Sequence, residues 1–208
     1  MQITVLDHPL ARHKVSLLRD RGTPVILFRS LTEELGLLLA VEATRNLTTV
    51  ATLIETPLEQ IHTQTMCGPD PVLVPVLRAG LGLVPAFLKL LPTAKVGHIG
   101  LYRDHETLRP VPYYLNLPSK LEERTLYLLD PMLATGGSAS EAIRQIKDAG
   151  AKNITLVCVI AAPEGVSRLE KDHPDIRIVA GAMDRELNEQ GYILPGLGDA
   201  GDRTFGTM

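Results

Sequence analysis

The chain has 208 residues and a formal net charge of −3, with 45% hydrophobic and 22% charged residues. That composition suits one large globular domain, and the small net charge creates no global attraction to nucleic acid or to an anionic membrane. No basic region followed by an apolar stretch opens the sequence, and the longest apolar run, residues 154–162, is far shorter than the ~20 residues that span a bilayer. We therefore expect a cytoplasmic protein without nucleic-acid or membrane partners.

The first predicted element is a long helix that begins at a capping box. Ser30 is followed three residues later by Glu33, and an apolar segment comes after them. This pattern predicts a helix from Ser30 to about Leu53. We interpret its leucine-rich segment, residues 35–39, as core or as a dimer interface.

Farther along the chain, short apolar runs alternate with amphipathic segments. The run from Pro71 to Leu77 has the length and the continuous apolar character of a strand that is buried on both faces. An apolar stripe from Ala139 to Ala149, followed by Gly150, is typical of a helix with a left-handed C-terminal cap. The alternation predicts an α/β fold in which a central parallel sheet is flanked by helices. The other runs that we predict to be strands are residues 94–101, 125–129, 154–161 and 176–180.

Ligands of such sheets bind beyond the carboxyl ends of the strands, and a first polar stretch lies at one such end. Asp130 follows the predicted strand 125–129, and residues 134–138, Ala-Thr-Gly-Gly-Ser, lead into a helix that begins near Ser138. Glycine N–H groups, hydroxyls and a helix N-terminus all favour an anion. Because no lysine follows the glycines, as it does in a nucleoside-triphosphate P-loop, we interpret the loop as a site for a phosphate on a sugar.

Two further strand ends carry arginine. In LRAGLG, Arg78 ends a strand and precedes a helix that runs to about Leu91. Arginine can bind two phosphate oxygens with parallel N–H groups, although Arg78 taken alone is equally well explained as a solvated charge. Arg103 follows a strand that we predict to end at Leu101, and it opens a polar insertion. A polar insertion of this kind in a compact domain favours a mobile lid.

Together these stretches resemble a known family. LLDPMLATGGS resembles the motif with which type I phosphoribosyltransferases bind 5-phospho-α-D-ribose 1-diphosphate (PRPP), where two adjacent acids usually precede the loop. Here Pro131 takes the second position, and DPMLATGGS, LRAGLG and GYILPGLGDAGDR are similar, in the same order, to the uracil phosphoribosyltransferase branch. The resemblance covers essentially the whole chain. It implies a type I phosphoribosyltransferase fold in a single domain, residues 1–208. That domain would have a core of roughly 70–182, an N-terminal helical extension, a C-terminal hood over 183–208 and a mobile hairpin-like lid.

The resemblance also implies an activity, which is the conversion of uracil and PRPP to UMP and diphosphate in pyrimidine salvage, with Mg²⁺ bound through PRPP. Displacement at a cation-like sugar carbon requires a bound leaving group and a positioned base, and no protein nucleophile. By resemblance, the catalytic residues are Asp130, Arg78 and Arg103, and Asp199 is a further candidate to contact the metal. The residues expected to bind PRPP are Arg78, Arg103, Asp130, Pro131, Met132, Leu133, Ala134, Thr135, Gly136, Gly137, Ser138 and Asp199, and those expected to bind uracil are Ile193, Gly198, Asp199 and Ala200.

Three other functions stay open on the sequence. They are an RNA-binding regulator built on the same fold, a nonenzymatic subunit that senses PRPP or a nucleotide, and a phosphoribosyltransferase for another base. The net charge of −3 and the lack of a Lys/Arg cluster disfavour the first. Members of the family are commonly homodimers, and some form larger assemblies that GTP activates. The residues alone do not decide whether GTP activates this chain. Cys67 and Cys158 form no CxxC pair, and Cys158 is expected to be a small core residue.

Overall fold

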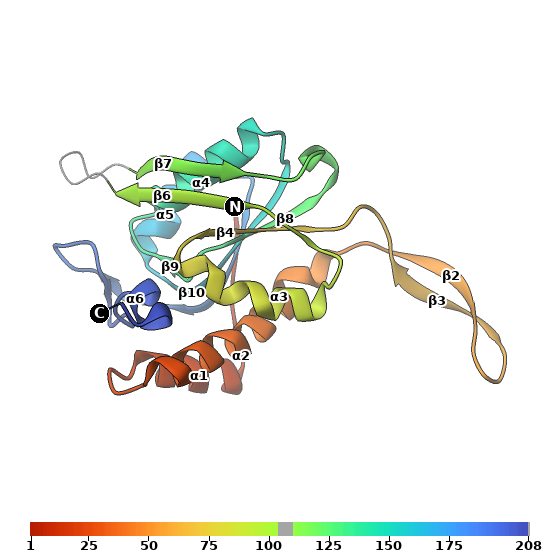
Figure 1. Cartoon of the computed structure of the whole chain (residues 1–208), viewed down its shortest axis with the longest axis horizontal. Helices are drawn as coiled ribbons and strands as arrows, with labels where there is room; N and C mark the ends of the chain where they lie inside the picture. Colours follow the sequence, from red (N-terminus) through yellow and green to blue (C-terminus); the bar gives the residue numbers. More distant parts are fainter. Residues whose placement is uncertain (104–109, 208) are drawn as a thin grey trace.

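A computed structural model describes residues 1–103 and 110–207 of the chain, with the backbone alone at Arg103. In this part, a nine-stranded and mostly parallel sheet has the strand order β1-β11-β10-β8-β4-β6-β7, with β5 paired to β4 and β9 paired to β10 (Figure 1). The strands are β1 (Gln2–Val5), β2 (Thr49–Glu55), β3 (Gln60–Met66), β4 (Val72–Leu77), β5 (Lys95–Val96), β6 (His98–Arg103), β7 (Pro110–Asn116), β8 (Thr125–Leu129), β9 (Met132–Leu133), β10 (Asn153–Ala161), β11 (Arg177–Met183), β12 (Glu186–Leu187) and β13 (Ile193–Leu194). The α-helices are α1 (Pro9–Arg19), α2 (Val25–Ala43), α3 (Val84–Leu90), α4 (Gly137–Asp148), α5 (Pro163–Asp172) and α6 (Ala200–Phe205), and the 3₁₀ turns are η1 (Thr44–Asn46), η2 (Ala79–Leu83) and η3 (Leu121–Glu123).

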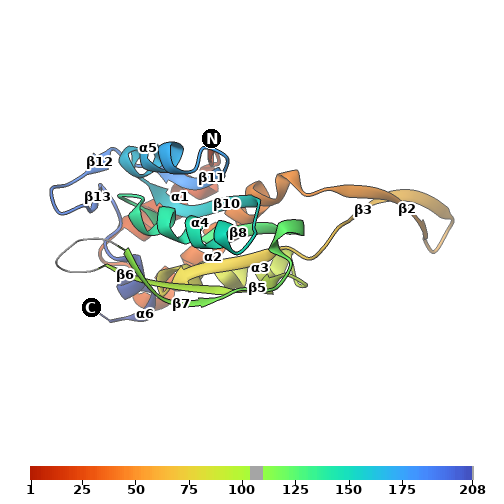
Figure 2. The same ribbon diagram turned by 90° about the horizontal axis from the view of Figure 1, so that it is seen from above.

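The parallel strands of the sheet are buried on both faces, as their continuous apolar runs predict. Successive side chains point to opposite faces, so Leu73, Tyr127 and Val157 join a core with α1, α2 and α3. Leu126 and Leu156 join a second core with α4 and α5 on the other face. Figure 2 shows the helices on the two sides of the sheet. The α/β architecture with a central, mostly parallel sheet is therefore confirmed.

The predicted strands and the helix over 139–149 are confirmed to within a few residues, except that the run 94–101 forms two strands, β5 and β6, which Gly97 separates. Helix α4 ends at Asp148, and Gly150 has a φ of +101°, which is the left-handed backbone expected of a glycine after a helix. β6 continues to Arg103, two residues beyond the predicted end, and pairs antiparallel with β7. The predicted hairpin-like lid follows Arg103 and includes Pro110 and Pro112, which belong to β7, and its residues 104–109 lie outside the described part of the chain.

The predicted helix from Ser30 to Leu53 is wrong at both ends. Helix α2 begins at Val25, directly after Pro24. The Ser30 hydroxyl donates to Glu34 instead of capping the helix. The helix ends at Ala43, and β2 begins six residues later. The segment TVATLIE is rich in β-branched residues, which favour a strand. It pairs in full register with β3.

The sequence prediction lacks, among other elements, the strand β1 and the β2–β3 pair. The N-terminal strand β1 pairs in parallel with β11 and forms one edge of the sheet. The antiparallel pair β2–β3 forms an arm that projects away from the body of the molecule (Figure 1). Both are short or largely exposed, so their apolar pattern is too weak to identify them.

Candidate active site

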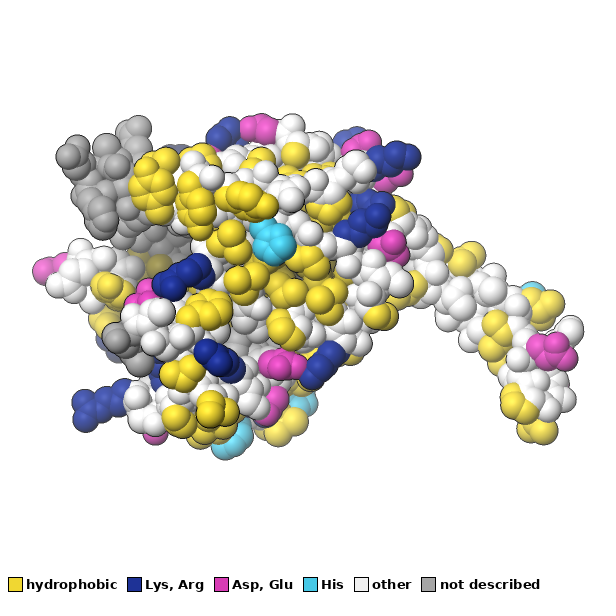
Figure 3. Space-filling view, in the orientation of Figure 1, with side chains coloured by type: hydrophobic (Ala, Val, Ile, Leu, Met, Phe, Trp, Pro, Cys, Tyr) yellow, Lys and Arg dark blue, Asp and Glu magenta, His cyan; other side chains and the backbone are white. Residues whose placement is uncertain are grey.

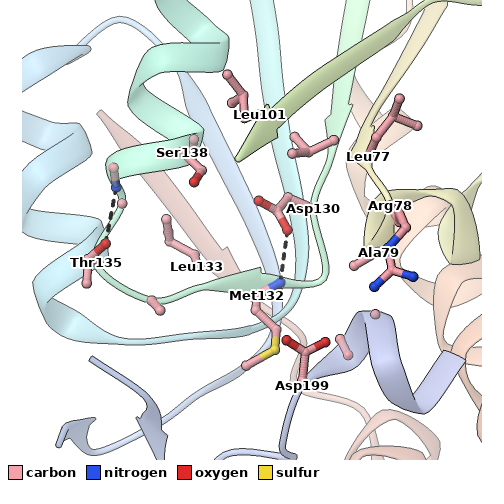
Figure 4. A pocket seen from close by; sticks show the side chains of 17 residues that line it. Leu77, Arg78, Ala79, Leu101, Asp130, Met132, Leu133, Thr135, Ser138 and Asp199 are labelled. Atoms are coloured by element: carbon pink, nitrogen blue, oxygen red, sulfur yellow. Dashed lines mark hydrogen bonds between the residues drawn. The ribbon is translucent and has the colours of Figure 1, made fainter. Parts of the chain in front are cut away.

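A cavity of about 330 Å³ opens at the carboxyl ends of β4 and β8, where the sheet rule places a ligand (Figure 4). Four segments that are distant in the sequence meet there, namely the β4–η2 junction, β6 at Leu101, the loop between β8 and α4, and the start of α6. The residues that line the cavity are Val76, Leu77, Arg78, Ala79, Leu101, Asp130, Met132, Leu133, Ala134, Thr135, Gly136, Gly137, Ser138, Ala139, Asp199, Ala200 and Gly201.

Asp130 is the first residue beyond β8, and its half-buried carboxylate points into the cavity. The Asp130 N–H donates a 3.1 Å hydrogen bond to the Val157 carbonyl of β10, so the position of Asp130 relative to that strand is fixed. Desolvation raises the pKa of Asp130 to about 7, and a 3.5 Å hydrogen bond from the Met132 N–H opposes that rise. A hydroxyl group or a positive charge on a ligand would therefore stabilise the ionised form of this carboxyl group, because it would replace the water that burial removes.

The loop after Asp130 presents backbone N–H groups at the N-terminus of α4. Gly136 is the N-cap residue and has a φ of +74°, and α4 begins at Gly137, one residue before the predicted start. The Thr135 hydroxyl accepts a 3.4 Å hydrogen bond from the Gly137 N–H. A Cβ on Gly136 would lie 2.9 Å from the Gly165 carbonyl oxygen, so glycine is required for the close packing of this loop on α5. The N-terminal end of a twelve-residue helix is thus aimed at the cavity, as an anion site requires.

The β4–η2 junction brings Arg78 to the same cavity. A Cβ on Gly80 would lie only 2.2 Å from the Leu129 carbonyl oxygen, so the glycine lets η2 pack directly against the end of β8. The exposed Arg78 guanidinium donates to Asp202 of α6 at 3.3 Å and lies 5.9 Å from the centre of the Phe205 ring. Asp202 and Phe205 were not predicted as site residues, because only the folded chain brings α6 against η2.

The C-terminal segment predicted to form a hood, residues 183–207 of the described chain, lines one side of the cavity through Asp199, Ala200 and Gly201. Asp199 caps α6 by accepting a 2.8 Å hydrogen bond from the Asp202 N–H, and Asp199 and Ala200 both line the cavity. Ile193 is buried in the apolar core, and Gly198 is exposed. Neither of them lines the cavity.

The predicted site residues divide accordingly. Those that line the cavity are Arg78, Asp130, Met132, Leu133, Ala134, Thr135, Gly136, Gly137, Ser138, Asp199 and Ala200. Pro131 and Gly198 lie next to lining residues in the chain without lining the cavity themselves, and Ile193 lies six residues before the nearest lining residue, Asp199. The Arg103 side chain lies outside the described part of the structure.

Neither cysteine has the surroundings of a nucleophile. Cys158 is fully buried, and burial together with the charge of Asp130 raises the pKa of its thiol. This confirms Cys158 as a small core residue. Cys67 is exposed and free, directly after β3, and does not line the cavity.

The described residues offer two carboxylates to a metal ion in this cavity, Asp130 and Asp199, which come from opposite walls. Across residues 1–103 and 110–207, no three His, Cys, Asp or Glu side chains gather closely enough to hold a metal ion. Magnesium prefers oxygen ligands and keeps several water molecules, so the donor set suits a metal that a phosphorylated ligand brings with it. None of the helices in this part of the chain combines the length and apolar character needed to cross a membrane.

Comparisons with known proteins bear on this site. A sequence model described as uracil phosphoribosyltransferase matches residues 5–207 of the chain. Curated proteins named uracil phosphoribosyltransferase from Bacillus cytotoxicus and Bacillus thuringiensis are each 53% identical to it, over 99% of this chain and 99% of their own length.

Among solved structures, the AQ2163 protein from Aquifex aeolicus superposes with a TM-score of 0.92 and 39% identity, over 98% of both chains. An adenine phosphoribosyl transferase from Trypanosoma brucei superposes with a TM-score of 0.60 over 95% of this chain and 88% of its own. At 13% identity, the latter likeness concerns the fold alone.

Proposed function

Because the chain belongs to the uracil phosphoribosyltransferase family, we propose that it converts uracil and PRPP to UMP and diphosphate in pyrimidine salvage. The observation that carries the proposal is the convergence of Asp130, the Thr135–Ser138 loop and Arg78 on one cavity at the carboxyl edge of the sheet. The carboxylate suits the ribose hydroxyls of PRPP, and the helix N-terminus suits its 5-phosphate. The guanidinium suits the diphosphate.

For PRPP, the proposal assigns the 5-phosphate to the backbone and hydroxyl groups from Met132 to Ser138. Asp130 accepts hydrogen bonds from the ribose hydroxyls, and its charge stabilises the sugar as positive charge develops at C1. Arg78 and Arg103 bind the diphosphate and so stabilise the negative charge that it gains as it leaves. Asp199, which lines the opposite wall, contacts PRPP or its metal.

In the reaction, the bond between C1 and the diphosphate oxygen breaks, and a bond from C1 to uracil N1 forms. Diphosphate leaves with the electron pair, and the N1 proton is lost. The protein accelerates this step by holding the two reactants in line and by electrostatic stabilisation. No nucleophilic side chain is needed, in agreement with the inert surroundings of Cys158.

Uracil recognition is assigned to the hood. Backbone N–H and carbonyl groups at Ile193 and from Gly198 to Ala200 pair with the alternating donors and acceptors of the uracil edge. The 4-amino group of cytosine would meet a donor where the site needs an acceptor, so buried polar groups would be left without partners. Support comes from the position of Asp199 and Ala200 on the cavity wall.

Mg²⁺ is part of the proposal as the partner of PRPP. The ion would neutralise diphosphate charge, with Asp130 and Asp199 as the protein carboxylates available to it or to its water molecules. Two carboxylates are too few to hold the ion alone, which favours binding together with PRPP.

We also propose that the chain is a homodimer. The β2–β3 arm supports this, because its strands pair only with each other, and an isolated two-stranded hairpin is marginal in water. Apolar side chains are exposed along the arm, with Leu58 95%, Leu53 55% and Met66 54% exposed (Figure 3). A second copy of the chain would cover them. Activation by GTP rests on the family resemblance alone.

One assay tests the function. Labelled uracil, PRPP and Mg²⁺ are incubated with the chain, and UMP and diphosphate are measured, with cytosine, orotate, hypoxanthine and adenine as competing bases. We expect UMP to form and uracil to be preferred. Turnover of another base in preference to uracil would make the chain a phosphoribosyltransferase of a different specificity, and no turnover at all would contradict the proposal. Initial rates across GTP concentrations test activation in the same experiment.

A further inference from the structure

We infer that Asp184 and Arg203, two buried charged residues outside the cavity, are positioning residues that fix the hood backbone in the orientation that recognises uracil. This inference rests on the proposed function. It concerns how a site built from peptide groups acquires its specificity, since no side chain at Gly196, Gly198 or Ala200 can select the base.

Asp184 holds one peptide of the hood from outside the cavity. It follows β11, is 5% exposed, and accepts a 2.9 Å hydrogen bond from the Gly196 N–H through Oδ2. Arg19 of α1 pairs with the same carboxylate, donating to Oδ2 at 2.8 Å. Arg19 also donates to the Gly196 carbonyl at 2.8 Å. Both the N–H and the carbonyl of Gly196 are therefore fixed by buried or half-buried charges, and such hydrogen bonds are the strong ones.

Arg203 fixes the next residue of the chain, Leu197. It lies on α6, is 7% exposed, and donates to the Leu197 carbonyl at 2.8 Å. It also donates to the carbonyls of Leu18 and Asp20 at the C-terminal end of α1, the second at 2.6 Å. Its guanidinium lies 4.4 Å from the centre of the Phe28 ring. Desolvation lowers the pKa of Arg203 and the charge of Asp20 opposes this effect, so the group is a charge held in the interior by carbonyl oxygens.

The two anchors act on consecutive residues, Gly196 and Leu197, directly before Gly198 to Ala200, which are proposed to read uracil. Gly196 and Gly198 have φ values of +65° and +80°, and glycine at such positions allows many other conformations. Unless an external group holds the chain, binding the base would also have to order this loop, and that ordering would weaken affinity for the base. Asp184, Arg19 and Arg203 order it in advance.

If Asp184 and Arg203 only stabilised the fold, replacing them would not weaken uracil binding more than PRPP binding. Arg177 provides a matched control for that case. Arg177, at the opposite end of β11, also has a mostly buried guanidinium that donates to carbonyls, to Ala43 at 3.3 Å and to Glu42 at 3.2 Å. It anchors α2 and has no contact with the hood. Arg177→Met therefore removes a comparable interaction from the opposite edge of the sheet.

The experiment compares Asp184→Asn, Arg203→Met, Arg203→Lys and Arg177→Met with the wild type. It measures kcat, the KM for uracil, the KM for PRPP and the unfolding temperature. We expect Asp184→Asn and Arg203→Met to raise the KM for uracil by about 10-fold or more while the KM for PRPP changes by less than about two-fold. Arg203→Lys should recover part of the loss, and Arg177→Met should lower the unfolding temperature without changing the KM for uracil.

Other outcomes would overturn the inference. Equal changes in both KM values, an unchanged KM for uracil, or the same uracil defect in Arg177→Met would each reduce Asp184 and Arg203 to general stabilisers. If Arg203→Met does not fold, Arg203→Lys and Asp184→Asn decide the question. Failure of the wild type to make UMP is a separate result that contradicts the proposed function. In that case, uracil binding measured by calorimetry tests the inference, and absent or unaltered binding contradicts it.

Discussion

Arg78 and Asp202 form an ion pair across the mouth of the cavity, with 3.3 Å between Nη2 and Oδ1, although 124 residues separate them in the sequence. The guanidinium proposed to bind diphosphate is thus held by a carboxylate of the hood helix α6. The pair is well exposed, so its contribution is small, and the anion of PRPP can replace the carboxylate.

Removing that carboxylate should therefore tighten PRPP binding. Exposed pairs contribute about 0.2–1 kcal/mol, so Asp202→Asn should lower the KM for PRPP by about 1.4- to 5-fold. The gain should shrink at high salt, because screening weakens exposed pairs. Asp148→Asn, which removes a 2.7 Å partner of Arg144 on the surface of α4, is the control and should leave this KM unchanged. An increase in KM after Asp202→Asn would show that Asp202 helps to bind PRPP instead of competing with it.

The raised pKa of Asp130, about 7 against an ordinary 3.8, makes stability depend on pH. Between these values the folded chain keeps a proton that the unfolded chain has lost. The stabilising contribution is therefore complete below 3.8 and disappears as the pH rises through 7. Asp130→Asn has no such group, so relative to the wild type it should gain on the order of 4 kcal/mol of unfolding free energy at high pH and little in acid. Denaturant unfolding near pH 4 and pH 8 measures this difference, and an equal gain at both would contradict it.

The same ionisation should appear in catalysis. The Asp130 carboxylate must be charged to stabilise the cation-like sugar, so kcat/KM for PRPP in the wild type should rise with pH through an apparent pKa of about 7. Asp130→Asn should lower kcat by about 100-fold and abolish this dependence. A variant that keeps the same pH profile would assign the ionisation to another group.

Gly136 should be required for PRPP binding for a second reason besides its left-handed backbone conformation. Gly136 and Gly68 have φ values of +74° and +93°, so alanine costs about 1–2 kcal/mol of strain at each. At Gly136 the new Cβ would also lie 2.9 Å from the Gly165 carbonyl oxygen, whereas at Gly68 nothing lies within 4 Å. We expect Gly136→Ala to raise the KM for PRPP by about 10-fold or more and Gly68→Ala to leave it unchanged. Equal effects would show that strain alone explains the loss.

The exposed arm should hold the proposed dimer together. Leu53 and Leu58 are 55% and 95% exposed, so replacing them should cost the folded chain little stability. Leu53→Asp combined with Leu58→Asp should shift the mass measured by light scattering toward that of one chain, because buried charges would oppose association. Gln60→Lys, at an exposed position of the same arm, tests whether any added charge has this effect. A wild-type chain that is already monomeric would contradict the proposal.

The sequence alone was enough to predict the parallel sheet and most of the candidate site. Asp130 and the Thr135–Ser138 loop are contiguous, and a strand, an acid, glycines and a helix start follow one another in the chain. Local physical chemistry thus specifies both the structure and the kind of ligand. The helix predicted from Ser30 to Leu53 failed for the opposite reason. A capping box inside α2 was taken for its start, and the segment beyond Ala43 forms a strand because β3 pairs with it.

The tertiary structure decided which distant groups meet. Arg78 with Asp202, Arg19 with Asp184 across 165 residues, and Arg203 with the end of α1 are contacts that no local pattern encodes. Each depends on where whole elements pack, and that packing is set by the summed burial of many apolar side chains on the two faces of the sheet. The sequence by itself predicted a PRPP-type site at a strand end. Only the folded chain brought the C-terminal segment to the cavity and supplied the buried charges that hold this segment.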